Sequence, residues 1–180
     1  MAYTAKDGYT VEGLLHFGYG HVDAARTLFG DDPAFLDSAG YLAHLGVELV
    51  LKAWHLAWFE QFDNNHDLIK LFEALKKKDG SLDIGADNEK FLTELNKFYL
   101  LRYPRRKNGP VEVGSDQLEH LEALLEALWK TIPKELVETY EKIDRTRKGG
   151  RVLMKKKITE ETPPNNTVER DGPKAARPSR

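Results

Sequence analysis

The sequence has 180 residues, of which 41% are hydrophobic and 31% are charged, and its formal net charge is −2. This composition is typical of a soluble globular protein, and the length allows one domain with a sizeable core. Cysteine is absent, which excludes disulfides and thiolate metal sites. The first ten residues, MAYTAKDGYT, have neither the basic nor the apolar region of a signal peptide, so we expect a cytoplasmic protein.

The charge is distributed unevenly along the chain. Residues 145–180 carry 11 Lys and Arg against 4 Asp and Glu, a net charge of +7, whereas residues 1–144 carry 16 against 25, a net charge of −9. The basic segment cannot bury enough apolar surface to fold, so we expect a disordered tail. Such a tail is either simply solvated or contacts an acidic partner such as nucleic acid. The predicted organisation is a folded body of residues 1–144 and a basic tail of 145–180.

The first predicted helix covers residues 11–29, where apolar side chains recur at helical spacing. Gly18 and Gly20 interrupt it, and two glycines so close together indicate a backbone contact or a local break. The next helix has a clear start, because Asp32 can act as its N-cap and Pro33 as its first helical residue.

Residues 38–59, SAGYLAHLGVELVLKAWHLAWF, form the predicted central helix, because they are apolar on nearly every side. One face carries small side chains that would allow another helix to approach closely: Ala39, Ala43, Gly46, Val50, Ala53 and Ala57. Glu48 and Lys52, one turn apart, are the only Asp, Glu, Lys or Arg in the run, and buried ions must be paired. These charges and two His interrupt the apolar run, so we expect no membrane span.

A third helix is predicted to begin at the cap formed by residues 64–67 and to run to about Lys78. Asp87 is the expected cap of a fourth helix, which Pro104 ends. The apolar side of this helix is predicted to continue through Phe91, Leu95 and Phe98 to Arg102.

The fifth predicted helix is rich in leucine and has Ser115 as its expected cap. Pro133 breaks or kinks it, and the helical pattern then continues to about Asp144. The body shows no convincing β-strand. The predicted fold class is therefore all-α, an up-and-down bundle of about five helices with short connections.

A polar cluster inside this bundle is the main candidate site. Arg102 lies on the inner stripe of the fourth helix, so it should meet an acid, and Glu48 is the natural partner. This predicts a binding cluster of Glu48, Lys52 and Arg102, joined by His66 from a helix start and by Tyr103 beside the arginine. The alternatives are a structural ion-pair network that only sets the register of the helices and, for His66, a residue held by its own turn.

Other kinds of site have less support. His44 and Glu48 share one helix face, but no third ligand follows at a usual spacing and HExxH is absent, so we expect neither a metal nor a cofactor. Arg105 and Arg106 follow the fourth helix and could contact phosphate. The helix dipole and a solvated loop explain the same cations without a ligand.

Three stretches of the chain, AGYLAHLGVELVLKAW, HDLIKLFEAL and FLTELNKFYLLRYP, stand in a characteristic order and spacing. In this respect the sequence resembles the HEPN domain (higher eukaryotes and prokaryotes nucleotide-binding) over about residues 35–135. The resemblance implies an up-and-down helical bundle that is commonly a homodimer. It also implies roles in nucleotide or RNA transactions, toxin–antitoxin systems and defence.

Many proteins of that family are metal-independent ribonucleases, in which Arg stabilises the phosphorane charge and a nearby His moves the proton of the 2′-hydroxyl. A His at the family's spacing from Arg102 would stand at position 107, 108 or 109, which are Lys, Asn and Gly here. The ribonuclease motif is therefore incomplete, and only His66, from another helix, could replace its His.

Three functions remain open at this point. The first is a binding module for nucleotide or RNA without catalysis. The second is a diverged ribonuclease with Arg102 and His66 as catalytic residues. The third is a structural bundle that reaches a partner protein through its basic tail.

Overall fold

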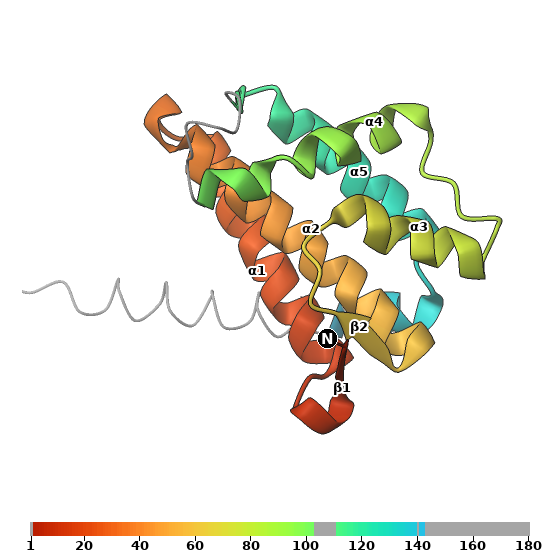
Figure 1. The fold of residues 1–180 in the computed structure, drawn as a ribbon. Coiled ribbons are helices and arrows are strands. Elements are labelled where there is room, and N and C mark those ends of the chain that lie inside the picture. Colours follow the sequence, from red (N-terminus) through yellow and green to blue (C-terminus); the bar gives the residue numbers. More distant parts are fainter. Residues whose placement is uncertain (1, 103–110, 140, 143–180) are drawn as a thin grey trace, which may run out of the picture. The chain divides into compact units, whose positions relative to one another are not determined.

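The computed structural model describes residues 2–102, 111–139 and 141–142, and Figure 1 shows that helices dominate this part of the chain. The longer helices are α1 (Val11–Phe29), α2 (Leu36–Phe59), α3 (Leu68–Lys78), α4 (Ala86–Leu95) and α5 (Gln117–Thr131). Three 3-10 helices are η1 (Ala5–Asp7), η2 (Pro33–Phe35) and η3 (Phe98–Arg102). Residues 134–139 and 141–142 are also helical after Pro133. The predicted all-α bundle is confirmed, and the predicted tail of 145–180 lies outside the described residues.

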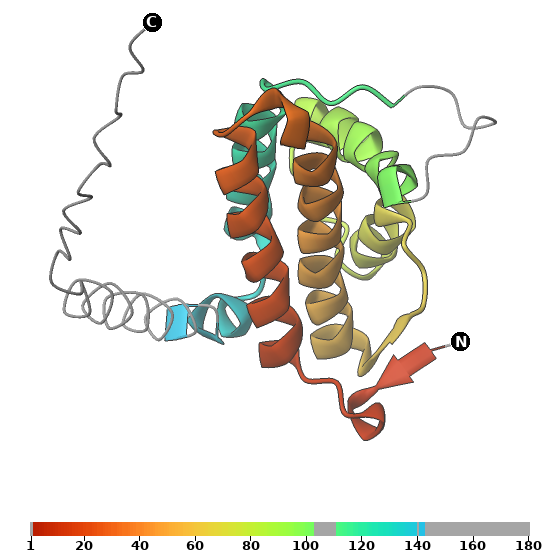
Figure 2. The same cartoon turned by 90° about the vertical axis from the view of Figure 1, so that its left-hand side faces the viewer.

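Helix α2 lies at the centre of the bundle. It runs side by side with α1 in the opposite direction, as Figures 1 and 2 both show. It also contacts α3, α4, α5, η3 and β2 (Gln61–Asp63). Leu51 and Trp54 of α2 are fully buried together with Leu15 of α1 and Leu121 of α5. The apolar side chains of α2 therefore face protein in several directions, which is the physical reason for its nearly uniform hydrophobicity.

By length and hydropathy alone, the segment Pro33–Phe59 could cross a membrane, since an 18-residue window has a mean hydropathy of 1.2. Half of that window is buried inside the bundle. Glu48 and Lys52, which this segment contains, are buried and paired with each other. A core helix passes the same length and hydropathy test, and we interpret α2 as a core helix.

Two of the predicted caps are confirmed. Asp32 Oδ1 accepts a hydrogen bond from Ala34 N at 2.8 Å at the start of η2, which leads directly into α2. Asp67 Oδ1 accepts hydrogen bonds from Ile69 N and Lys70 N, at 3.1 Å and 3.3 Å, and so caps α3. Each cap satisfies backbone donors that the helix itself leaves without a partner.

The fourth and fifth predicted helices need correction at their ends. Helix α4 begins after Gly85 rather than at a cap formed by Asp87, and α5 begins after Asp116 rather than after Ser115. Helix α4 also stops at Leu95, and the chain re-forms as the separate 3-10 helix η3. The 3.6-residue stripe therefore does not continue to the end of η3, because a 3-10 helix has three residues per turn.

The prediction that the body has no strand was wrong. Strand β1 (Ala2–Thr4) pairs antiparallel with β2, with Tyr3 opposite Phe62. Phe62 is 4% exposed, and its ring packs against Tyr3 and against Tyr9, with centroid distances of 5.7 Å and 5.1 Å. Strands of three residues are too short to show an alternating pattern, and their pairing joins distant parts of the sequence.

The C-terminal end of α2 has an unusual backbone. Glu60 ends the helix in the left-handed conformation, with φ 59° and ψ 9°, and among the described residues it is the only one besides glycine with positive φ. That conformation costs a residue with a side chain about 1–2 kcal/mol. Lys78, at the end of α3, supports this end of α2 by donating to the carbonyl oxygen of Trp58 and lying 4.8 Å from the Phe59 ring centroid.

Two glycines allow α1 and α2 to approach closely. A Cβ atom at Gly46 would lie 2.7 Å from Val22 Cγ2 and 2.9 Å from the carbonyl oxygen of Gly18. The backbone contact expected near the glycines of α1 is therefore confirmed for Gly18. It does not involve Gly20, where no atom would lie within 4 Å of an added Cβ.

Replacement of Gly46 by Ala should destabilise the bundle. Overpacking against the backbone of α1 costs about 1–3 kcal/mol, which exceeds the gain of about 1 kcal/mol from better helix propensity. The measurement is the free energy of unfolding in urea. The matched control is Gly20→Ala, which has the same propensity gain and no clash and should stabilise the protein slightly. If both variants are equally stabilised, the two helices do not meet at Gly46.

Candidate functional site

The polar cluster is built around the carboxylate of Glu48, which is 2% exposed in the middle of α2. Lys52, one turn further along, donates from Nζ to Oε1 at 2.5 Å. His66 Nδ1 lies 3.0 Å and 3.1 Å from the two carboxylate oxygens, and His44 Nε2 lies 3.5 Å from Oε2. The structure therefore surrounds one buried acid with three basic side chains. It brings together Glu48, Lys52 and His66, as the sequence predicts.

These neighbours keep the Glu48 carboxylate ionised. Burial by itself raises the pKa of Glu48, but His44, Lys52 and His66 outweigh that effect and lower the pKa to about 2. The pair with Lys52 is therefore a buried ion pair. Removing one member of such a pair leaves an uncompensated buried charge, which is strongly destabilising.

His44 connects Glu48 to the end of α4. The side chain is 1% exposed, and Nδ1 lies 3.0 Å from the carbonyl oxygen of Leu95. A carbonyl oxygen only accepts, so Nδ1 carries the proton of this hydrogen bond. Nε2 faces Glu48 at 3.5 Å, which is long for a hydrogen bond, and the contact is attractive when Nε2 also carries a proton. The surroundings of Glu48 therefore depend on where α4 ends.

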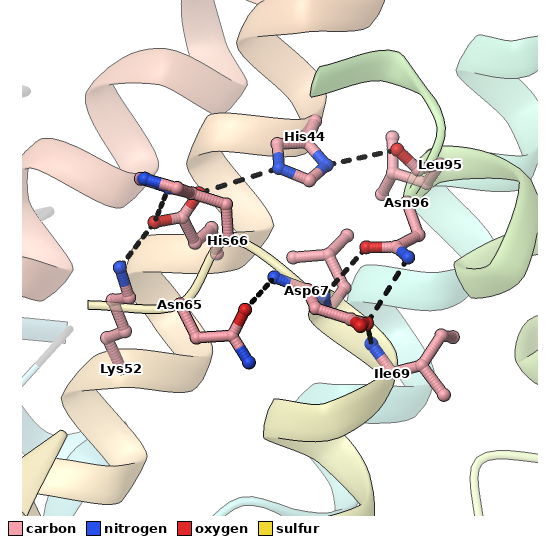
Figure 3. A network of polar contacts seen from close by, with 10 residues as sticks. His44, Lys52, Asn65, His66, Asp67, Ile69, Leu95 and Asn96 are labelled. Carbon is pink, nitrogen blue, oxygen red and sulfur yellow. Dashed lines mark hydrogen bonds and ion pairs between the residues drawn. The ribbon is translucent and has the colours of Figure 1, made fainter. Parts of the chain in front are cut away.

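A hydrogen-bonded loop holds His66 in place, as Figure 3 shows. Asn65 Oδ1 accepts from Asp67 N at 3.0 Å. From the end of α4, Asn96 Oδ1 accepts from Leu68 N at 2.8 Å, and Asn96 Nδ2 donates to Asp67 Oδ1 at 3.3 Å. The loop is thus tied both to α3 and to α4, so His66 is oriented by groups on two other elements.

The contact with Glu48 also determines which nitrogen of His66 is protonated. A carboxylate only accepts, so Nδ1 of His66 carries a proton and donates it to Glu48. In the neutral ring, Nε2 is then the nitrogen with the lone pair. The His66 side chain is 51% exposed, so a ligand or solvent can reach it. This is the arrangement in which a buried acid orients a histidine for proton transfer.

A cavity of about 250 Å³ opens beside this cluster. Its lining residues are Tyr41, His44, Leu45, Glu48, His66, Tyr99 and Arg102. Tyr99 and Arg102 come from η3, and both side chains are exposed to solvent. The cavity therefore combines the cation of Arg102, the imidazole of His66 and two tyrosine rings.

The expected direct pairing of Glu48 with Arg102 needs correction. In the described part of the chain, the ionic partners of Glu48 are His44, Lys52 and His66, and Arg102 reaches the same cavity with an exposed side chain. The physical reason is the break after α4: a residue in η3 does not keep the inward direction that a continuous helix would give it.

The remaining predicted residues lie elsewhere. Tyr103, Arg105 and Arg106 lie outside the described residues. No group of three or more His, Asp and Glu suited to a metal ion occurs within residues 2–102, 111–139 and 141–142. Of the residues predicted for the site, Glu48, His66 and Arg102 line the cavity.

Sequence reasoning did not assign His44, Asn96 or the two tyrosines to this site. His44 precedes Glu48 by four residues, the spacing that also relates Glu48 to Lys52, so the helix face was a usable signal. Asn96 gave no such signal, because its role depends on the approach of α4 to the loop before α3.

The fold and the site define a helical-bundle domain with a buried acid–base cluster beside a small cavity. The sequence model of the HEPN domain family matches residues 20–132 of this chain. Because the match covers more than half of the chain, the protein belongs to the HEPN domain family. Comparison with curated proteins and with solved structures yields no match.

Glu48 should make stability depend on pH in the acidic range. Its pKa in the folded protein, about 2, lies below the ordinary value of 4.5, so the unfolded chain binds the extra proton between these values. The stabilisation is therefore complete above 4.5 and is lost as the pH falls towards 2. We expect Glu48→Gln to lower the free energy of unfolding by about 3 kcal/mol at neutral pH. The difference between the wild-type protein and this variant should shrink as the pH falls towards 2.

The measurement is urea unfolding of both proteins over a range of pH. Glu126→Gln is the matched control. Glu126 Oε1 lies 2.7 Å from Lys130 Nζ, four residues further along the same helix, but this pair is on the surface. The control substitution should change stability little at any pH. If the loss of unfolding free energy in Glu48→Gln stays constant down to acidic pH, the assignment of an ionised, buried Glu48 is wrong.

Proposed function

We propose that this protein is a binding module that holds a nucleotide, or an unpaired nucleotide of RNA, in the cavity beside Glu48. The observation that supports this most directly is the lining of that cavity: Arg102 and His66 stand beside Tyr41 and Tyr99. Arg binds phosphate through a planar fork of N–H donors. Aromatic rings stack on bases of any sequence.

The charges of the cluster are compatible with a phosphate. Glu48 alone would repel an anion, but the ammonium of Lys52 lies 2.5 Å from its carboxylate and balances the charge. Arg102 then adds a positive charge to the lining of the cavity. The volume of about 250 Å³ lies below the range of about 300–1,000 Å³ that is usual for small-molecule sites, so the cavity would enclose part of one nucleotide and leave the rest in solvent.

Family membership supports a wider setting, which is part of the same proposal. The protein would act as a homodimer in the cytoplasm, in a toxin–antitoxin or defence system, with or without a partner protein. Residues 145–180, with their excess of Lys and Arg, would add non-specific attraction to nucleic acid.

Arg102→Ala should weaken binding of the proposed ligand. We expect the dissociation constant for a short single-stranded RNA, or for AMP, to rise about tenfold or more, because a charge-assisted contact to phosphate is lost. Isothermal titration calorimetry at fixed salt measures it. Lys97→Ala removes an exposed cation close to η3 that does not line the cavity, and it should leave binding unchanged. Equal losses in both variants would show only a general effect of charge.

A diverged ribonuclease is the second candidate, and the Glu48–His66 contact favours it. His66 Nε2 would take the proton of a 2′-hydroxyl, and the resulting oxygen would attack the adjacent phosphorus. The products would be a 2′,3′-cyclic phosphate and a 5′-hydroxyl fragment, which takes a proton from water. Arg102 would stabilise the charge on the phosphorus oxygens.

Incubation of the protein with single-stranded RNA in EDTA tests this candidate. Cleavage with cyclic phosphate ends should fall about 10²-fold or more in His66→Ala and should also fall in Arg102→Ala. His16→Ala removes an exposed histidine of α1 and should have no effect. If the wild-type protein binds RNA and leaves it intact, the binding module stands and the ribonuclease does not.

A further inference from the structure

A second cavity lies where the C-terminal end of α2 meets β1, η1 and the start of α1. Its volume is about 630 Å³, within the range of about 300–1,000 Å³ that is usual for small-molecule sites. It shares no residue with the cavity beside Glu48. Its apolar lining consists of Ala5, Tyr9, Val11, Leu56 and Phe59, and its polar lining of Thr4, Lys6, Thr10, Glu60 and Gln61.

Glu60 is an unfavourable residue for its position in the fold. It adopts the left-handed conformation that glycine usually provides at the end of a helix. Its carboxylate also stands at the negative end of the α2 dipole, where a cation would be preferred. Within the described part of the chain, the Glu60 side chain has neither a hydrogen bond nor an ion pair that would offset these costs. Backbone strain of this kind is concentrated at functional sites.

Lys6 provides the opposite charge in the same cavity. Its backbone N–H takes part in the cap of η1, but its side chain is exposed and has no ionic partner among the residues that the structure describes. Among the described residues, the lining of the cavity therefore contains one carboxylate and one ammonium, each without a described partner, together with five apolar side chains. A ligand with a single charge would satisfy one of these groups and leave the other unmatched.

We propose that this cavity binds a small zwitterion with a large apolar side chain, that is, a free amino acid of the phenylalanine or leucine type. The ligand's ammonium group pairs with Glu60, and its carboxylate pairs with Lys6. Its side chain packs against Tyr9, Leu56 and Phe59, where burial of apolar surface supplies most of the binding free energy.

The chemistry of this cavity differs from that of the cavity beside Glu48. Glu60 would repel a phosphate, and among the described residues Lys6 is the one cation in the lining. A nucleotide is therefore a poor ligand here, and the proposal stands or falls independently of the proposed nucleotide site.

Titration of the full-length protein with three related compounds tests the proposal. L-phenylalanine has both charges, phenethylamine lacks the carboxylate and 3-phenylpropionate lacks the ammonium group. We expect saturable binding of L-phenylalanine by calorimetry and binding about tenfold weaker or worse for each analogue. No saturation with L-phenylalanine at millimolar concentrations would overturn the proposal.

Substitutions test whether Glu60 binds the ammonium group of the ligand and Lys6 its carboxylate. Glu60→Gln should weaken binding of L-phenylalanine and of phenethylamine but not that of 3-phenylpropionate. Lys6→Gln should weaken binding of L-phenylalanine and of 3-phenylpropionate but not that of phenethylamine. Glu12→Gln removes an exposed acid of the first turn of α1 that does not line the cavity, and it should change nothing. If both Glu60→Gln and Lys6→Gln bind L-phenylalanine as tightly as the wild-type protein does, the assignment is overturned.

Glu60→Gly separates a ligand-binding role from a structural one. Glycine relieves the left-handed strain and removes the acid from the helix end, so the melting temperature should rise while L-phenylalanine binding is lost. A lower melting temperature would mean that Glu60 is present for stability, and this would overturn the proposal.

Discussion

The buried ion pair of Glu48 and Lys52 is the constraint on which the rest of the site depends. Both side chains lie within the central helix and are almost completely excluded from solvent. A carboxylate in such a place needs partners from every direction, because its own helix supplies only part of the compensation. His44 comes from the same helix, and His66 comes from the loop before α3. The contact with the Glu48 carboxylate thus holds His66, from another element, at the edge of a cavity.

The end of α4 links the two sides of that cavity. Leu95 offers its carbonyl oxygen to His44, and the next residue, Asn96, holds the loop that carries His66. The chain then enters η3, which contributes Tyr99 and Arg102 to the lining of the cavity. A shift of this one helix end would therefore change the surroundings of Glu48 and the position of Arg102 together. The residues that line the cavity are therefore coupled through the end of α4.

The central helix thus supports two cavities of different chemistry. Near its middle, the charge of the Glu48 carboxylate is balanced by basic neighbours, and Arg102 lines the cavity beside it. At its C-terminal end, Glu60 and Lys6 remain unpaired within the described residues, and the surrounding lining is largely apolar. Membership of the HEPN domain family relates to the bundle as a whole. The chemistry assigned to each cavity comes from its own side chains.

The sequence by itself determined the helical fold class, the caps at Asp32 and Asp67 and the pairing of Glu48 with Lys52, but not the ends of α4 and α5. All of these depend on residues within a turn or two of one another, so spacing along the chain reveals them. Tertiary structure alone decided that Arg102 meets the cavity from a separate 3-10 helix and that β1 pairs with β2. It also decided that Glu60 and Lys6, far apart in the chain, line one cavity. Such contacts join distant segments, and their geometry is set by helix packing, which no local pattern records.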